Sequence, residues 1–245
     1  MFAAGLPVRS ANALIEGPDE LAGLISAVLL TDSGSYVRHD SMFTTSVPRF
    51  TDPLAGETDA VTLLFTVLNA PAEDATREFR LTLSDLDRAA GATARGSVAL
   101  RDFSGFSVSD IVVAPETMPV GWQRGDASIA FAPLATYRPG ETVQLYYEVY
   151  GLAADAAYET EIELVPPSDG VADRMLDLLG RDRAVRFRFE GRADPPHPIH
   201  GQQQNRTIAM QDVHPGIWTL RVRVTDVASG RSTQRETAIE IAGES

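Results

Sequence analysis

Two residue types are missing from this sequence of 245 residues: it has no cysteine, and all 21 of its basic residues are arginine. Without cysteine there are no disulfides, thiolate nucleophiles, iron–sulfur clusters or sulfur-ligated zinc sites. Without lysine, Schiff-base chemistry, the phosphate-binding P-loop and the Ser-x-x-Lys hydrolases are excluded. Few classes of enzyme survive both absences, so we expect no catalytic residues and no cofactor.

Positive charge is also scarce, because 34 acidic residues stand against 21 basic ones and give a formal net charge of -13. Such a chain repels nucleic acid and anionic membrane surfaces, and we expect neither as a partner. The longest apolar run, residues 21–30, is shorter than the roughly 20 residues needed to span a bilayer. Residues 1–17 lack the basic and apolar regions of a signal peptide, so we expect none in this sequence.

What the sequence does contain is hydrophobic alternation with a period of two, which is typical of antiparallel strands with one solvated face. Residues 217–226, IWTLRVRVTD, are the clearest case, since apolar side chains alternate with threonine and arginine. The second half has about seven such segments, the number that an immunoglobulin-like sandwich needs. They are residues 127–132, 143–150, 158–164, 185–190, 206–211, 217–226 and 234–241. A short helix is expected near residues 171–179, with Gly180 as its C-terminal cap.

The first half repeats this pattern in residues 21–30, 36–45, 61–68, 78–83, 96–102 and 106–113. Residues 114–126 contain two prolines, two glycines and no alternation, which favours a linker. We therefore predict an all-β fold with two immunoglobulin-like antiparallel β-sandwich domains in tandem. Their predicted bounds are residues 1–113 for the N-terminal domain, 114–126 for the linker and 127–245 for the C-terminal domain.

Residues 141–152, ETVQLYYEVYGL, contain the best candidate for a binding site. Alternation directs Val143, Leu145, Tyr147 and Val149 toward the core. The opposite face then carries Tyr146, Glu148 and Tyr150, an aromatic pair on either side of a carboxylate. Such a set is able to stack on a sugar or grip an extended peptide.

Three alternatives for these tyrosines stay open. They pack against the linker or the other domain, and are then architectural. In a carbohydrate-binding module, Tyr146 and Tyr150 would be exposed and coplanar on a concave face. In a carboxylate-dependent glycoside-active domain, two acidic groups would converge in a cleft, and burial would raise the pKa of one of them.

Two other patterns are weaker. His197 and His200 lie three residues apart in a proline-flanked loop, with no third ligand near them in the sequence, so we expect a solvent loop and no metal. The acidic clusters at residues 84–87 and 168–170 lack the spacing of a calcium-binding loop and are typical of turns.

Three segments together suggest a family: FSVSDIVVA at residues 106–114, YRPGETVQLYYEVYGL at residues 137–152 and HPGIWTLRVRVTDVASGR at residues 214–231. Their order resembles the C-terminal β-sandwich region of bacterial GWxTD-domain proteins, over roughly residues 61–240. The GWxTD motif itself is absent, since Gly121-Trp122 is followed by Gln-Arg-Gly-Asp. The resemblance implies the fold and an exported bacterial setting, and it implies no activity.

The resulting hypothesis is a non-catalytic β-sandwich interaction or accessory region of a larger exported bacterial protein, acting in the periplasm or outside the cell. Its expected partner is a protein or a glycan, bound first by Tyr146, Glu148 and Tyr150.

Overall fold

The computed structural model describes residues 2–7, 23–30, 36–44, 49–50, 61–66, 75–85, 90–116, 122–130, 136–166, 184–197, 200–211 and 213–242. These residues form β-strands and connecting turns, which confirms the all-β prediction. The chain divides into two compact units, Met1–Asp102 and Phe103–Ser245. The helix predicted near residues 171–179 lies outside the described residues. Among those described, no helix has the length and hydrophobicity that a bilayer crossing requires.

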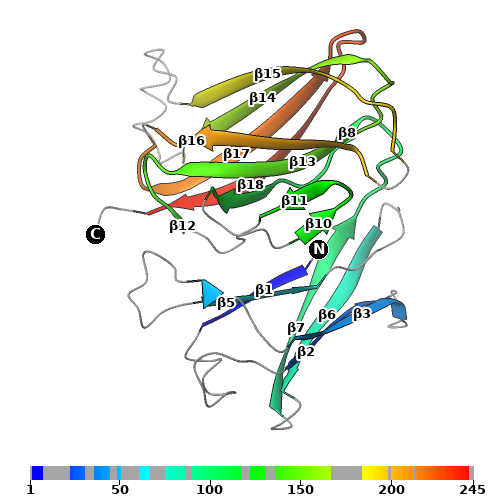
Figure 1. Cartoon of the computed structure of the whole chain (residues 1–245), viewed down its shortest axis with the longest axis vertical. Helices are drawn as coiled ribbons and strands as arrows, with labels where there is room; N and C mark the ends of the chain where they lie inside the picture. Colours follow the sequence, from blue (N-terminus) through cyan, green and yellow to red (C-terminus); the bar gives the residue numbers. More distant parts are fainter. Residues whose placement is uncertain are drawn as a thin grey trace. The chain divides into compact units, whose positions relative to one another are not determined.

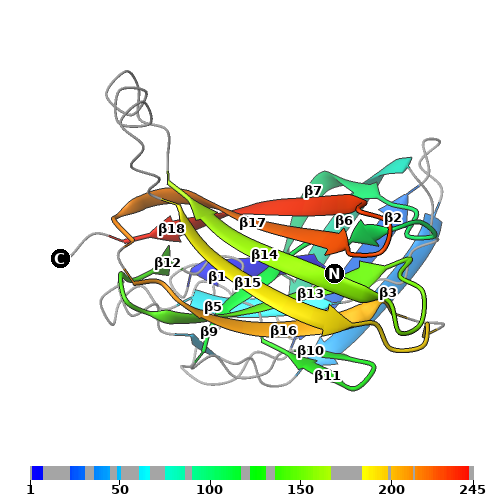
Figure 2. The same ribbon diagram turned by 90° about the horizontal axis from the view of Figure 1, so that it is seen from above.

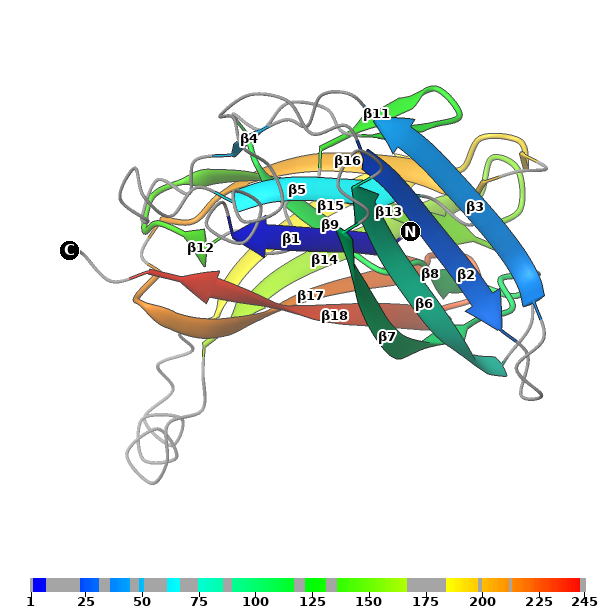
Figure 3. The same cartoon turned by 90° about the horizontal axis from the view of Figure 1, so that it is seen from below.

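The first unit contains two antiparallel sheets (Figure 3). In one, the strand order is β3 (Tyr36–Thr44), β2 (Gly23–Leu30), β6 (Ala75–Asp85) and β7 (Ala90–Leu100). In the other, β5 (Val61–Thr66) lies between β1 (Phe2–Pro7) and β4 (Arg49–Phe50). Residues 23–30 of the apolar run predicted as a strand form β2, whereas β1 and β4 were not predicted.

The second unit is a sandwich of two sheets (Figures 1 and 2). The smaller sheet has β13 (Thr142–Tyr150) at its centre, with β16 (Gln202–Ala209) on one side and both β8 (Ser107–Val108) and β9 (Val112–Pro115) on the other. The larger sheet has the order β12 (Thr136–Tyr137), β18 (Ser232–Ile241), β17 (Gly216–Asp226), β14 (Ala157–Val165) and β15 (Val185–Arg192). A separate hairpin pairs β10 (Trp122–Arg124) with β11 (Ala127–Ile129).

The chain crosses between the two sheets from β13 to β14, from β15 to β16 and from β16 to β17, which is the strand arrangement of immunoglobulin-like sandwiches. The core lies between the sheets. As alternation predicts, Val143, Leu145, Tyr147 and Val149 of β13 are all buried in it. The larger sheet contributes Tyr158, Ile162, Leu164, Trp218, Leu220, Val222, Val224, Ile239 and Ile241.

The predicted linker was wrong in its position. The units divide after Asp102, and residues 112–115 and 122–129 are strands of the second unit rather than parts of a connection. Val113 lies opposite Leu145 in the β9–β13 pair, and Gly125-Asp126 is the two-residue turn of the β10–β11 hairpin. Pro115 therefore marks a strand end, and Gly125 lies in a tight turn. The strand predicted at residues 106–113 is divided into β8 and β9, and both pair with β13.

Two glycines with positive φ differ in packing, so together they separate the cost of the backbone conformation from the cost of close contact. Gly140 has φ 79° and nothing within 4 Å of an added Cβ, whereas Gly151 has φ 71° and would place a Cβ 2.6 Å from the Gly105 and Phe106 backbone. We expect Gly140→Ala to lower the free energy of unfolding by about 1 kcal/mol. Gly151→Ala should lower it by about 1–3 kcal/mol more, because the backbone must also move.

Urea unfolding of both variants, monitored by tryptophan fluorescence, measures this difference. Equal losses of stability would show that the Gly151 contact does not constrain the fold.

Candidate functional site

The predicted binding residues lie together on the outer face of β13, but the β10–β11 hairpin covers them. Tyr146 is 5% exposed and Glu148 only 2% exposed. Tyr150 is half-buried, and its ring stacks on that of Phe103 with the centroids 4.5 Å apart. The prediction that the two tyrosines flank a carboxylate on one face is therefore correct in geometry, while the face is not open to solvent.

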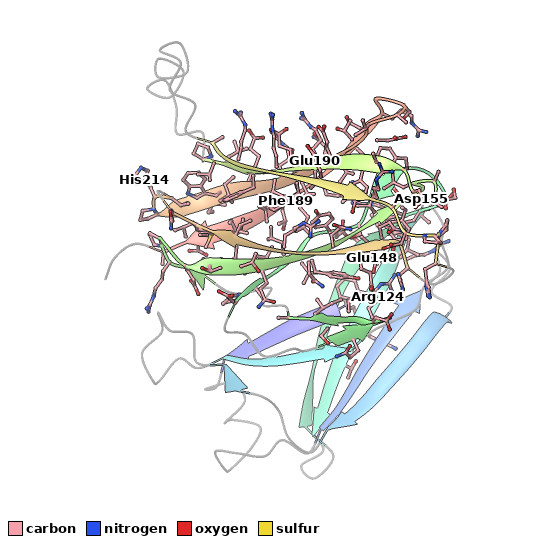
Figure 4. All side chains as sticks on the ribbon, turned by 45° about the horizontal axis from the view of Figure 1, so that its top comes forward. Arg124, Glu148, Asp155, Phe189, Glu190 and His214 are labelled. Atoms are coloured by element: carbon pink, nitrogen blue, oxygen red, sulfur yellow. The ribbon has the colours of Figure 1, made fainter. Side chains whose placement is uncertain are left out.

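The Glu148 carboxylate accepts five hydrogen bonds from the protein. Oε1 accepts from Arg124 Nε and from the Tyr146 hydroxyl at 2.5 Å. Oε2 accepts from Arg124 Nη2 at 3.2 Å, from the Tyr150 hydroxyl and from the Gly201 backbone N–H at 3.1 Å. We call these five residues the Glu148 cluster. Figure 4 shows Arg124 of the hairpin beside Glu148 of β13.

The electrostatics of the cluster favour a permanently ionised carboxylate. Burial alone would raise the pKa of Glu148, but hydrogen bonds from Arg124, Tyr146 and Tyr150 outweigh it and lower the pKa. Burial, with the hydrogen bond to Glu148, raises the pKa of Tyr150 to about 12 and also raises that of Tyr146. At neutral pH the cluster is thus an ion pair with two protonated tyrosines, and it offers neither a general base nor a phenolate.

The hairpin is held to the sheet by apolar contacts and by further polar ones. Ala127 and Ile129 of β11 are buried against Tyr146 and Val112. Gln203 of β16 donates from Nε2 to the Arg124 carbonyl at 2.5 Å and to the Tyr146 hydroxyl at 3.1 Å. A Cβ added to Gly125 would lie 2.7 Å from His200, so the turn of the hairpin rests closely on that ring. Together these contacts attach the β10–β11 hairpin to the smaller sheet.

Sequence analysis missed Arg124, the main partner of Glu148, because it lies 24 residues away in what was taken for a linker. A signal was present: Gly-Asp between two short segments is typical of a type II′ hairpin turn, and Gly125 has the positive φ of 57° that this turn requires. Ser109 was missed as well. Its hydroxyl accepts a hydrogen bond from the Glu148 backbone N–H, and its own N–H donates to the Glu148 carbonyl, both at 2.9 Å.

At the Glu148 cluster, the geometry matches neither of the two carbohydrate-related alternatives. Stacking on a sugar requires exposed aromatic rings, whereas Tyr146 is buried and hydrogen-bonded. A glycosidase acid requires a carboxyl group with a raised pKa, whereas the pKa of Glu148 is lowered. All contacts described for its carboxylate come from hydrogen-bond donors, so no second acidic group among the described residues is paired with it.

The two loop histidines lie face to face rather than around a common point. The rings of His197 and His200 stack with centroids 3.8 Å apart and an interplanar angle of 11°. His200 Nδ1 lies 2.8 Å from the Gly201 carbonyl oxygen. Across the described ranges, histidine, aspartate and glutamate side chains form no group of three that could hold a metal ion.

Comparison with known proteins gives little further information. No family model and no curated protein matches the chain. Among solved structures, it is similar to a calcium-binding mutant of Bacteroides uniformis beta-glucuronidase 2, with 7% identity and a TM-score of 0.33. That match covers 97% of this chain and 26% of the glucuronidase chain. At that TM-score it carries no argument about fold or function.

Glu148→Gln tests whether the cluster stabilises the fold. The amide leaves the partly buried Arg124 without its counter-charge, so we expect the free energy of unfolding at pH 7 to fall by about 2–3 kcal/mol. Urea unfolding followed by tryptophan fluorescence measures the loss. Glu240→Gln, at an exposed position of β18, is the matched control and should change stability by less than about 0.5 kcal/mol.

The same variant has a defined pH dependence. Because the folded-state pKa of Glu148 lies below its ordinary value of 4.5, ionisation stabilises the fold above that pH. This contribution is lost as the pH falls through the lower folded-state pKa. The difference in stability between wild type and Glu148→Gln should be constant above about pH 5.5 and shrink below about pH 4. A difference that grows in acid would contradict the assignment.

Arg124→Gln should loosen the hairpin more than the sandwich. We expect backbone amides of residues 122–129 to exchange with deuterium at least about tenfold faster, because hairpin opening then costs less. Amides of β14 and β17 should keep their protection. Arg223→Gln, which removes an exposed arginine of β17 that hydrogen-bonds only Gln234 at 3.2 Å in the described structure, is the control. Equal acceleration throughout the second unit would show that Arg124 supports the whole sandwich instead.

Proposed function

We propose that this chain is a non-catalytic interaction or accessory region of a larger exported bacterial protein. The observation that carries the proposal is the state of the Glu148 cluster. The most functional-looking residues of the sequence are used to attach a hairpin to a sheet, and each carboxylate oxygen already accepts at least two hydrogen bonds. The groups of the Glu148 cluster are therefore engaged with each other rather than positioned for a substrate.

The chemistry of the described residues also supports a binding role. The only carboxylate among the buried polar residues described is that of Glu148. Cysteine and lysine nucleophiles are absent from the whole sequence. The resemblance of three segments to the C-terminal region of GWxTD-domain proteins supports the exported bacterial setting. Two of those segments meet in the structure, where Ser109 of the first bonds the backbone of Glu148 in the second.

The outer face of the larger sheet is less suited to binding than its borders. Charged side chains there neutralise each other in a row across four strands: Arg186 to Glu163 at 2.9 Å, Glu163 to Arg221 at 2.8 Å and Arg221 to Glu236 at 2.7 Å. Such exposed pairs add little stability, and they leave little unbalanced charge on the interior strands β14 and β17 to attract a partner. Recognition through backbone hydrogen bonds at a strand edge does not depend on unbalanced charge on the sheet face.

The proposal predicts no turnover. The purified full chain is incubated with a panel of aryl glycosides, including glucuronides, and release of the aryl group is followed against a buffer blank. We expect no rate above the blank. Turnover that co-elutes with the folded chain through two purification steps would overturn the non-catalytic assignment.

A glycan array tests the carbohydrate-binding alternative with the same protein. We expect no glycan bound through Tyr150, the most accessible member of the cluster. Specific glycan binding that is lost in Tyr150→Ala but kept in Tyr137→Phe, a conservative change in the core of the same unit, would favour that alternative over a protein partner.

A further inference from the structure

We propose that the open edge of β15 is a docking site for an extended peptide with acidic side chains at alternate positions, which adds to the larger sheet as a further antiparallel strand. The inference rests on the proposed interaction function and names a surface and a partner chemistry for it.

Strand β15 ends the larger sheet. It pairs with β14, and no other strand in the described part of the chain pairs with it (Figure 2). The N–H of Ala193 donates to the Ala156 carbonyl at 2.9 Å, which fixes the direction of the backbone groups. Because these groups alternate along a strand, those of Arg188, Glu190 and Arg192 point away from β14. A row of backbone donors and acceptors therefore faces the open edge.

The inner face of β15 is incompletely covered. Val185, Phe187 and Phe189 pack against the core but are only half-buried. The residues that lie opposite two of them on β14, Ile162 and Thr160, are 0% and 1% exposed. An added strand with apolar side chains on this face would complete the burial of the phenylalanines. Figure 4 shows Phe189 and Glu190 on this strand.

The outer face of β15 carries a charge pattern opposite to that of the whole protein. Its side chains are Arg186, Arg188, Glu190 and Arg192, while the chain as a whole has a net charge of -13. The Arg188 side chain is 81% exposed, so its weak contact with Glu161 at 3.3 Å leaves it accessible. Acidic groups would be attracted to this strand and repelled by most of the remaining surface.

Strand β14 shows which side chains suit this face. It places Glu163 opposite Arg186 and Glu161 opposite Arg188, and both pairs form ion pairs. It also places Glu159 opposite Glu190, a like-charge pair that a basic residue on the other side of β15 would relieve. An ideal partner therefore offers acidic residues opposite the three arginines and a basic residue opposite Glu190.

A second copy of the chain fits this edge less well than such a peptide. Two copies of β15 paired antiparallel along their whole length, about a two-fold axis at Phe189, would match Arg188 with Glu190. The same register would place Arg186 opposite Arg192 in both halves. Half of the charged pairs would then be repulsive.

The test uses the full chain and a fluorescein-labelled peptide with the order glutamate, valine, arginine, valine, glutamate, valine, glutamate. Fluorescence anisotropy measures binding. A second peptide of the same composition, with the arginine moved to its first position, mismatches two of the four charged pairs in either direction. We expect the first peptide to bind at least about fivefold more tightly than the second. Equal affinity would overturn the proposal, because only net charge would then matter.

Protein variants locate the site. Arg188→Glu should weaken binding of the first peptide about fivefold or more, whereas Arg223→Glu should leave it unchanged. Arg223 points to the same face of the same sheet but lies on the interior strand β17, so it is a matched control. Equal losses in the two variants, or no loss in Arg188→Glu, would overturn the docking site.

N-methylated peptides test the strand addition itself. In the proposed antiparallel pair, the backbone N–H groups of the charged peptide residues face β15 and those of the valines face away. Methylation of the amides of the second glutamate and the arginine should abolish binding, whereas methylation of two valine amides should preserve it. The reverse result, or no binding up to about 1 mM, would overturn the edge proposal. The absence of glycoside turnover is a separate result, so either proposal can fail alone.

Discussion

A carboxylate withdrawn from water must find its hydrogen bonds and its counter-charge within the protein. In the second unit this requirement falls on Glu148, and it determines how the β10–β11 hairpin is attached to the outer face of the smaller sheet. Arg124 comes from the hairpin, two hydroxyls come from the same strand as Glu148, and one N–H comes from Gly201, the residue before β16. Removal of any one donor leaves the others around an undercompensated charge. The hairpin therefore belongs to the fold, although it joins neither sheet.

The requirement of Glu148 for hydrogen bonds explains the tyrosines on the outer face of strand β13. On its inner face Tyr147 fills the core, and on its outer face Tyr146 and Tyr150 direct hydroxyl groups at the carboxylate between them. Tyrosine suits the outer face because its ring packs under the hairpin while its hydroxyl reaches a partner. A single strand thus joins three layers, the larger sheet, the smaller sheet and the hairpin. The proposed binding therefore falls to surfaces that this arrangement does not use.

Sequence reasoning succeeded where the signal is local. The alternation in residues 217–226 and 143–150 gives both the strands and the faces that they bury, since the period of a strand is fixed by its geometry. It missed β10 and β12, which have three and two residues and are too short to show a period, and it merged β8 and β9 into one strand. It also placed Tyr146, Glu148 and Tyr150 on one face but could not supply Arg124, because that pairing depends on tertiary structure. Proline and glycine mark turns inside a domain as readily as links between domains, which explains the displaced boundary.

The position of that boundary has a practical consequence for anyone who divides the chain. A shortened protein that begins at residue 127 would retain the strands with the strongest hydrophobic pattern, yet it would lose β8, β9 and β10. The edge of β13 that pairs with β8 and β9 would then have no partner, and its backbone N–H and C=O groups would face solvent. Such a fragment would be prone to associate with itself through an edge that does not exist in the intact unit. A fragment that begins at residue 103 keeps that edge closed.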